Sequence, residues 1–537
     1  MAQESKVDKS IPSPPGLGHA LSIPAFRNLL TADLVSDVGT FMQTVGAAWL
    51  MISLKGTPTY VALIQTASAL PFFVFALPAG AIGDIVDRRK LVLYTETWML
   101  LVAIVVAGLT IRGWMSPLLL LVLTFALSAG DAFESPTWRA ILPEVVPSDD
   151  LPAAAALNGI EFNVARAVGP GLAGFIVAAA GVGTAFLLNA ASFVGVLVVI
   201  ARWKRPVHKR TSPPETVPGG IVTGVRYVRY SPTIRKLMLR IGLVTFFATA
   251  LTALLPLVAH HVKNGPVVFG ILLGCFGLGA VVGAVLMQRA RERWSAEVVV
   301  SFGIALYGIA TLAVGVVRAL PLLCLATFVG GAAWIMFISI INVIILNHSP
   351  DWVRARVLSI ATLALQGSVA IGSLAWGAFA THFGLTTALL CAGVGTIVAT
   401  ALALVLPLPV TKVDVTAWNH WPLPDLGRDS LPAGYETGPV LVTVEYAVSP
   451  ENAKEFLKAV QRYGRIRRRD GASRWSIYHD LENAHRYVET FIVSSWGEHL
   501  RQHERFTRAD REVEERLSQY IQDSPKVRHL VSAKPLG

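Results

Sequence analysis

The sequence has little charge and almost no cysteine. Only 15% of its 537 residues are charged and 53% are hydrophobic, whereas soluble domains carry about 25% charged residues. This composition excludes an ordinary soluble globular protein. The three cysteines, Cys275, Cys324 and Cys391, stand singly inside apolar runs without a C-x-x-C pair, which argues against a disulfide framework and a thiolate metal site. We therefore expect no metal ion and no cofactor.

The chain also lacks the pattern of a secretory signal peptide and that of a nucleic-acid-binding protein. Its first 18 residues are polar and rich in proline and glycine, without a basic segment followed by an apolar run and a cleavage site. The formal net charge is +11, but the basic residues gather at the ends of apolar segments and in the C-terminal tail. We expect no nucleic-acid partner, and we expect the first apolar segment to direct membrane insertion.

Long apolar runs dominate the rest of the chain. About 20 apolar residues cross a bilayer as a helix, and this rule predicts an all-α membrane protein with twelve transmembrane helices. The predicted spans are residues 29–52, 59–83, 91–111, 117–136, 153–180, 184–202, 238–261, 267–288, 297–317, 321–346, 355–380 and 385–408. Connections that hold at most one basic residue alternate with connections rich in Lys and Arg, which remain in the cytoplasm. We expect a multi-pass protein with its N-terminus, its central connection and its C-terminal tail in the cytoplasm.

The second half of the apolar region repeats the first at a constant offset of 203 residues. A parallel repeat of six plus six helices is one way in which transporters build a central pathway. The residues that align are Pro147 with Pro350, Asn163 with Gln366, Gly169 with Gly372, Gly174 with Gly377 and Gly181 with Gly384. The predicted domains are an N-terminal tail (1–26), a six-helix half (27–202), a cytoplasmic linker (203–236), a second six-helix half (237–408), a linker (409–437) and a C-terminal domain (438–537).

The C-terminal domain has the patterns of a soluble domain. VLVTVEYAV, SRWSIYHD and RYVETFIVSS alternate like strands, whereas ENAKEFLKAVQRYGRIRRR and SWGEHLRQHERFTRADREVEERLSQYI have helical periodicity. This β-α-β-β-α order predicts a ferredoxin-like α+β domain.

One local motif lies between the second and third predicted spans. It contains repeated glycines, acidic residues and a basic cluster: Gly80, Asp84, Asp87, Arg88 and Arg89. Charge-assisted hydrogen bonds in such a cluster can hold two helical bundles together in one state and release them in another. The alternative is that the charges only end the helix and set its orientation. Near the fourth span, Glu134 and Arg139 are further candidates for such a cytoplasmic gate, and Glu96 in the third span is of the same kind.

The motif resembles the cytoplasmic signature of the major facilitator superfamily, although Ile85 and Asp87 depart from the usual pattern. Pro136, Pro143, Pro147 and Asn163 fit the enterobactin-exporter-like (transmembrane secretion effector) branch of that superfamily. The resemblance covers residues 25–408 and implies a secondary transporter that works by alternating access, in a bacterial inner (plasma) membrane. Gly169, Pro170, Gly171 and Gly174 resemble the fifth-helix motif of the superfamily's antiporters, which implies export. A packing kink without directional meaning is the alternative.

Charged and polar residues within the spans are the main candidates for a functional site, because each is costly in a membrane unless it faces a cavity or a partner. Asp33 and Asp37 lie one helical turn apart on one face of the first span. A desolvated carboxylate can exchange a proton near neutral pH, so Asp37 is the first candidate for proton coupling, with Asp33 and Glu161 beside it. A structural ion pair is the alternative. The candidates for the substrate cavity are Asn163, Arg166, Gln366 and Trp376.

The C-terminal domain resembles the antibiotic-biosynthesis-monooxygenase family over about residues 440–535. That family forms ferredoxin-like homodimers and often works without a cofactor. His503 falls near the helical histidine of that family, whereas Phe491 stands where an aromatic residue of the family is usually tryptophan. We therefore favour a dimerising or regulatory module over a catalytic one.

These observations predict a transporter rather than an enzyme, with no catalytic residues. We expect a proton-coupled exporter of a small organic molecule, such as a siderophore or a hydrophobic drug-like compound. Its partners would be that substrate, protons, the lipid bilayer and a second copy bound through the C-terminal domain. A proton-coupled importer of the same fold and a membrane-anchored, cofactor-free monooxygenase are the alternatives.

Overall fold

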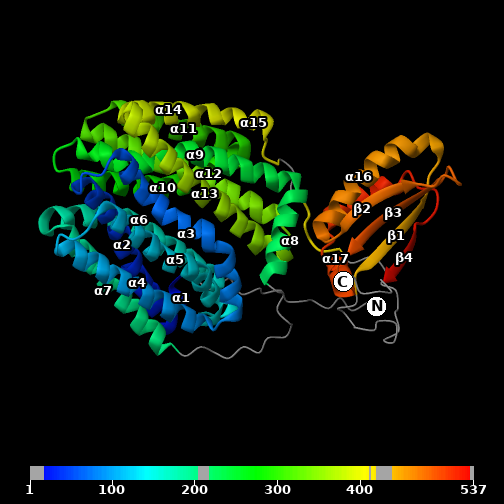
Figure 1. The fold of residues 1–537 in the computed structure, drawn as a ribbon, viewed down its shortest axis with the longest axis horizontal. Helices are drawn as coiled ribbons and strands as arrows, with labels where there is room; N and C mark the ends of the chain where they lie inside the picture. The colour runs from blue at the N-terminus through cyan, green and yellow to red at the C-terminus, as the bar shows by residue number, and fades with distance from the viewer. Residues whose placement is uncertain (1–16, 204–216, 410–412, 419–437, 532–537) are drawn as a thin grey trace, which may run out of the picture.

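A computed structural model describes residues 17–203, 217–409, 413–418 and 438–531. It contains a large bundle of long helices and a small α+β domain beside one end of the bundle, with α8 near the junction (Figure 1). We call the end of the bundle that faces the small domain the near end, and the opposite end the far end. Each predicted span falls on a helix of the bundle.

The N-terminal half of the bundle is built from α1 (Leu17–Ser22), α2 (Pro24–Ser53), α3 (Pro58–Ile85), α4 (Arg88–Ile111), α5 (Pro117–Val145), α6 (Leu151–Ala180) and α7 (Val182–Arg202). Proline at the first turn of α2, α3, α5 and α6 starts these helices at a position that needs no N–H donor. Ser116 and Asp87 cap α5 and α4 through their side chains. Gly181, with φ of 83°, ends α6 and begins α7.

The C-terminal half is built from α8 (Val217–Tyr230), α9 (Pro232–His260), α10 (Gly265–Arg293), α11 (Ala296–Val316), α12 (Leu320–His348), α13 (Asp351–Phe383), α14 (Leu385–Val398) and α15 (Leu402–Val405). The last predicted span, 385–408, is divided by a short 3-10 turn between α14 and α15. The predicted linker 203–236 contains α8, an amphipathic helix that we did not predict, and α9 begins inside the same range.

Eleven helices in the described part of the chain are long and apolar enough to cross a membrane. Among the helices that carry a predicted span, α2 falls outside this group, although it has 30 residues. Its polar residues, among them Asp33, Asp37 and Gln43, lower its hydropathy. The structure therefore bears out eleven of the twelve predicted spans by length and composition.

The two halves meet along two pairs of helices, α3 with α13 and α6 with α10. At the far end of the first pair, the hydroxyls of Thr59 and Thr381 lie 2.7 Å apart. Closer to the middle of the bundle, the hydroxyls of Thr66 and Ser373 are also 2.7 Å apart. These contacts close the far end between α3 and α13.

The small domain has the order β1 (Val440–Ala447), α16 (Ala453–Asp470), β2 (Ser473–His479), β3 (Arg486–Val493), α17 (Trp496–Glu504), α18 (Arg508–Ser518) and β4 (Lys526–Val531). The sheet order is β2-β3-β1-β4 and every neighbouring pair is antiparallel. Alternate residues of β1 and β3 are buried and pack with Phe456, Val460 and Tyr463 of α16. The strands and helices predicted from the alternation are present, whereas β4 was not predicted.

Candidate functional site

A cavity of about 240 Å³ lies where the two halves of the bundle meet. Its walls come from α2, α3 and α6 of the first half and from α9 and α10 of the second. Aromatic and aliphatic side chains dominate the lining, and four neutral polar residues and one charged residue complete it. The lining includes Phe41, Phe269 and Phe276, the polar residues Thr44, Gln65, Ser68 and Thr252, and the charged residue Arg166. Such a mixed, concave site between two moving units is typical of a ligand site.

The other predicted cavity residues do not line this cavity. Asn163 donates from Nδ2 to the carbonyl of Gly159 in its own helix, at 2.7 Å. Trp376 is 7% exposed and lies in the packed core of the bundle, where its indole N–H donates to the carbonyl of Phe246 at 2.9 Å. Gln366 is half-buried on α13 and is not among the lining residues.

Six carboxyl groups gather within the N-terminal half, on α2, α4, α5 and α6. We call them the carboxylate cluster: Asp33, Asp37, Glu96, Asp131, Glu134 and Glu161. Asp33 interacts electrostatically with Asp37, Glu161 and Glu134 and accepts a hydrogen bond from the Trp138 side chain. Asp37 interacts with Asp131 and with Glu161. The three residues predicted for proton coupling are therefore neighbours.

Glu96 and Glu134 form a buried pair inside the cluster. Their carboxyl groups are hydrogen-bonded to each other, and Thr95 donates to Glu134 Oε2 at 3.2 Å. Because an ionised carboxylate has no proton to donate, this arrangement needs a proton on at least one of the two groups. A cluster that shares protons among crowded carboxyl groups has the chemistry that proton coupling requires.

Asp131 is a member of the cluster that our sequence reasoning missed. It lies on α5 and interacts electrostatically with Asp37 of α2 and with Arg139 of its own helix. The signal was available, because Asp131 is an acidic residue inside a predicted span, as Asp37 is.

Among the described residues, no group of three or more His, Cys, Asp or Glu side chains has the arrangement of a metal site.

The predicted gate residues Arg88 and Arg89 bind within the N-terminal half. Arg88 Nη1 donates to Glu144 Oε1 of α5 at 2.9 Å and to the carbonyl of Ala140 at 2.8 Å. Arg89 donates to the carbonyls of Ile200 and Ala201 at the end of α7. These contacts fasten the start of α4 to α5 and α7, so they join helices of one half.

The remaining gate residues have diverse surroundings. The carboxylate of Asp87 accepts a hydrogen bond from the backbone N–H of Lys90 at 3.2 Å and caps α4. Arg139 is exposed, whereas Glu134 is buried in the carboxylate cluster. Gly80 and Asp84 fall in α3, and the surroundings of both residues lie outside what the structure describes.

The glycines of α6 allow close packing against neighbouring helices. A Cβ on Gly169 would lie 2.8 Å from Cβ of Phe41 in α2, and a Cβ on Gly174 would lie 2.6 Å from the carbonyl oxygen of Pro266 in α10. Gly171 has open space instead. Gly174 therefore brings the two halves together at the far end, where Pro170 of α6 also faces Gly270 of α10.

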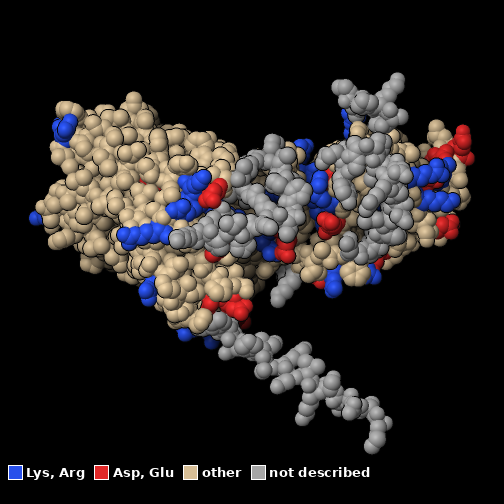
Figure 2. Space-filling view, turned by 90° about the horizontal axis from the view of Figure 1, so that it is seen from below, with Lys and Arg blue, Asp and Glu red and all other residues tan. Residues whose placement is uncertain are grey.

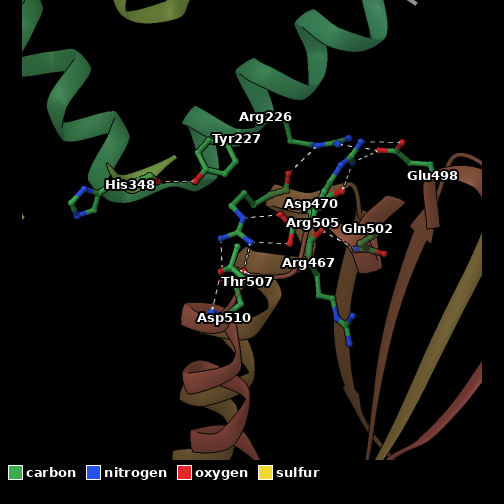
Figure 3. Close-up of polar contacts among 11 residues, drawn as sticks. Arg226, Tyr227, His348, Arg467, Asp470, Glu498, Gln502, Arg505, Thr507 and Asp510 are labelled. Carbon is green, nitrogen blue, oxygen red and sulfur yellow. Dashed lines mark hydrogen bonds and ion pairs between the residues drawn. The ribbon is translucent and has the colours of Figure 1, made fainter. Parts of the chain in front are cut away.

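The small domain docks on the near end of the C-terminal half (Figure 3). Arg226 of α8 reaches Glu498 of α17 at 3.2 Å and donates to the carbonyl of Arg469 at 3.3 Å. Three arginines of the domain lie over aromatic rings of the bundle: Arg469 over Tyr227, Arg468 over Tyr230 and Arg505 over Trp352, at 4.8 to 5.6 Å. Arginine over an aromatic ring is a favourable contact.

On the face that Figure 2 shows, charged side chains are sparse over the bundle and gather toward the small domain. Between the domain and the bundle lies a second cavity of about 270 Å³, lined on the domain side by Arg462, Arg465 and Arg469 and on the bundle side by Tyr227 and Tyr230. The tan surface of the bundle fits a protein whose sides face lipid, because apolar side chains are stable there.

Several known proteins that are similar to this chain are membrane transporters. The staphyloferrin A transporter of Staphylococcus aureus is 24% identical over 370 residues, 67% of this chain and 90% of that protein. The multidrug efflux pump Tap of Mycolicibacterium fortuitum is 26% identical over 398 residues, 71% of this chain and 92% of that protein. The crystal structure of a mutant of the nucleoside transporter NupG superposes with a TM-score of 0.62 at 12% identity, covering 71% of this chain and 99% of that chain.

The fold and its relatives define the class of protein: a membrane transporter of the major facilitator type, not an enzyme. Residues 19–535 match one family within that class, and the chain belongs to it: the transmembrane secretion effector family. This agrees with the resemblance seen in the sequence. The relatives give no support to a monooxygenase, so we do not pursue that alternative.

Proposed function

We propose that this protein is a proton-coupled exporter of a small organic molecule. The carboxylate cluster is the observation that carries the proposal, because it lies in the same half of the bundle as three walls of the central cavity. In the proposed cycle, Asp37 and its neighbours Asp33, Asp131 and Glu161 take up a proton and release it when the bundle changes state. Substrate occupies the cavity between the halves, and the halves rock about it.

The closed far end supports a place for this structure in the cycle. We propose that α2 also crosses the membrane, which brings the number of spans to twelve. We further propose that the near end and both termini face the cytoplasm, and that the membrane is the bacterial inner membrane. In this orientation the closed far end is the outer end, and its contacts support an inward-facing state. The contacts of Arg88 and Arg89 would keep the near end of the N-terminal half rigid as this state changes, and Gly80, Asp84, Asp87, Glu134 and Arg139 would complete the cytoplasmic gate.

The relatives support a small-molecule substrate. One is described as a staphyloferrin A transporter and another as a multidrug efflux pump, so a siderophore or a drug-like compound is the substrate class that we propose to test first.

We also propose that the small domain has the ferredoxin-like fold and pairs with a second copy. The sheet order β2-β3-β1-β4 supports the fold, and the exposed Tyr478 and Leu530 support a contact. Chemical crosslinking of the full chain in membranes tests the pair, and a purely monomeric product would contradict it.

The transport proposal is tested by efflux from cells that lack their own pumps. Cells loaded with a panel of anionic, neutral and cationic compounds are compared with and without an uncoupler, and the efflux rate of each compound is measured by mass spectrometry. We expect efflux that needs the proton gradient and that Asp37→Asn abolishes at equal expression. Asp149→Asn is the matched control, because Asp149 is exposed outside the cluster. Efflux that does not depend on the proton gradient, or uptake in place of efflux, would contradict the proposal.

A further inference from the structure

Arg166 is the one charged residue among those that line the central cavity. It lies on α6, about midway along the helix, beside aromatic residues. Its guanidinium carbon is 5.3 Å from the centre of the Phe276 ring, and it interacts electrostatically with the phenol of Tyr307. A guanidinium in the middle of a membrane protein is costly unless it faces a cavity or an anion.

No carboxylate pairs with Arg166 in the part of the chain that the structure describes. The carboxylate cluster lies in the same half, yet its members interact with one another and with Arg139 rather than with Arg166. Arg240, in contrast, has a carboxylate partner. It is fully buried in α9, and its guanidinium is 2.7 Å from the carboxylate of Glu297. Glu297 thus neutralises the buried Arg240, whereas no described carboxylate neutralises Arg166 in the cavity.

We propose that Arg166 binds an anionic group of the substrate, so that the transported compounds are amphipathic organic anions. This inference rests on the proposed function, because it assigns the substrate class of the same cavity. A guanidinium binds a carboxylate or phosphate with two parallel hydrogen bonds. Phe41, Phe269 and Phe276 offer flat apolar surfaces for the body of the molecule, and Gln65 with Thr252 offers neutral hydrogen-bonding groups.

The test uses three probes of the same shape and different charge: 1-naphthoate, 1-naphthamide and 1-naphthylmethylammonium. The thermal unfolding midpoint of the purified full-length protein is measured as each probe is added. We expect 1-naphthoate to raise the midpoint and the other two to have little effect. Arg166→Gln should weaken naphthoate binding by about 30-fold or more, the usual consequence of removing one partner of a buried charge pair, and Arg166→Lys should retain part of it.

Two control variants separate binding from structure. Arg112→Gln removes an exposed arginine that stacks on Trp114 at the end of α4, and it should leave naphthoate binding unchanged. Arg240→Gln should lower the midpoint without ligand, whereas Arg166→Gln should not. Equal binding of the three probes, binding of none of them, or naphthoate binding that survives Arg166→Gln would overturn the assignment. The assay needs no proton gradient, so anion binding without transport would count against the proposed function alone.

A second observation, independent of the cavity, concerns the small domain. The helix that it holds, α8, also contacts α13 and α9 of its own half and α3 of the other half. Gly220 and Gly224 of α8 face Arg356 near the start of α13, so these contacts lie at the near end. In an alternating-access cycle, the opposite state opens the far end and brings the near ends of the two halves together.

The geometry points to the docked domain as a brake on this movement: through α8, it favours the state with the closed far end. The test is a charge reversal in the Arg226–Glu498 pair, with spin labels at the exposed positions Tyr60 and Phe383 of the far end in a variant without native cysteines. Arg226→Glu should lengthen the distance between the labels, and adding Glu498→Arg should restore it. Arg229→Glu, on an exposed position of the same helix, should have no effect.

Hydrogen exchange provides the second measurement. Protection of β1 and β3 reports whether the domain remains folded in each variant, and protection of α8 and α16 reports whether it remains docked. If Arg226→Glu raises exchange in α8 and α16 while the label distance stays unchanged, docking of the domain does not affect the conformational equilibrium and the proposal is wrong. Restored distance in the double variant, with β1 and β3 protected throughout, supports it.

Discussion

Gly174 offers a direct test of how the far end closes. Changing Gly174 to alanine adds one methyl group that would lie 2.6 Å from the carbonyl oxygen of Pro266 and 3.1 Å from Cα of Val267. Both atoms belong to the backbone of α10, so the methyl group cannot be accommodated by turning a side chain. Overpacking of this kind costs about 1–3 kcal/mol, and the cost falls only on the state in which α6 and α10 touch.

The expected consequence is a shift in the conformational equilibrium. A difference of about 1–3 kcal/mol changes the ratio of two states by roughly 5- to 150-fold, so a closed state that dominates in the native chain should lose population to the open one. The assay is the distance between spin labels at positions 60 and 383, measured by pulsed electron paramagnetic resonance in lipid nanodiscs. We expect a second, longer distance to appear in Gly174→Ala.

Gly171→Ala is the matched control, because it lies three residues earlier on the same helix and a Cβ there would meet no atom within 4 Å. Both substitutions raise helix propensity by about 1 kcal/mol, so this effect is common to the two variants. If Gly174→Ala leaves the distance distribution unchanged, or if Gly171→Ala changes it equally, the far end is not closed by this contact and our reasoning fails.

Three further predictions follow from other parts of the structure. Arg240→Leu should destabilise the bundle by about 1–3 kcal/mol, because the carboxylate of Glu297 loses its ion pair. The double change Arg240→Leu/Glu297→Leu should regain part of the thermal unfolding midpoint. Equal midpoints in the native and single variants would contradict this. Burial, and secondarily the nearby His503 and His529, lowers the pKa of His499 to about 3, below its unfolded value of about 6.5. The stability of the small domain is therefore complete above about pH 6.5 and should fall by about 2 kcal/mol between pH 7 and pH 5, seen as faster hydrogen exchange in β1 and β3, whereas His499→Phe should flatten this dependence. Asp131→Asn should abolish gradient-dependent efflux, as we expect for Asp37→Asn, and undiminished efflux from the Asp131 variant would remove it from the coupling site.

The limits of sequence reasoning are visible at particular residues. The length and apolarity of the predicted spans locate the helices well, because a helix that crosses a bilayer must satisfy its own backbone hydrogen bonds over a fixed thickness. Alternation in VLVTVEYAV and RYVETFIVSS likewise predicts β1 and β3, which have one buried face. The strand β4 escaped prediction, because its residues are largely exposed at the sheet edge and carry no strong alternation of burial.

The site residues show the same division. Asp33, Asp37 and Glu161 were identified as costly charges in a membrane, and this argument needs only the sequence. Their proximity to one another depends on how α2, α5 and α6 pack. The pattern around Arg88 and Arg89 predicted a latch between bundles, whereas their described partners are Glu144 and backbone carbonyls of the same half. Periodicity cannot choose between such partners, because it places a side chain on a helix face and not beside a neighbour.

The sequence by itself determined that this chain lies in a membrane, that its apolar region is a repeated set of helices and that a soluble domain follows. These properties depend on local composition and on spacing along the chain. The tertiary structure alone decided that Arg166 faces a cavity where none of the described carboxylates pairs with it, that Asp131 joins the carboxylate cluster and that α8 connects both halves to the small domain. Each of these depends on which helix faces meet, and contacts between residues far apart in sequence arise only when the helices pack.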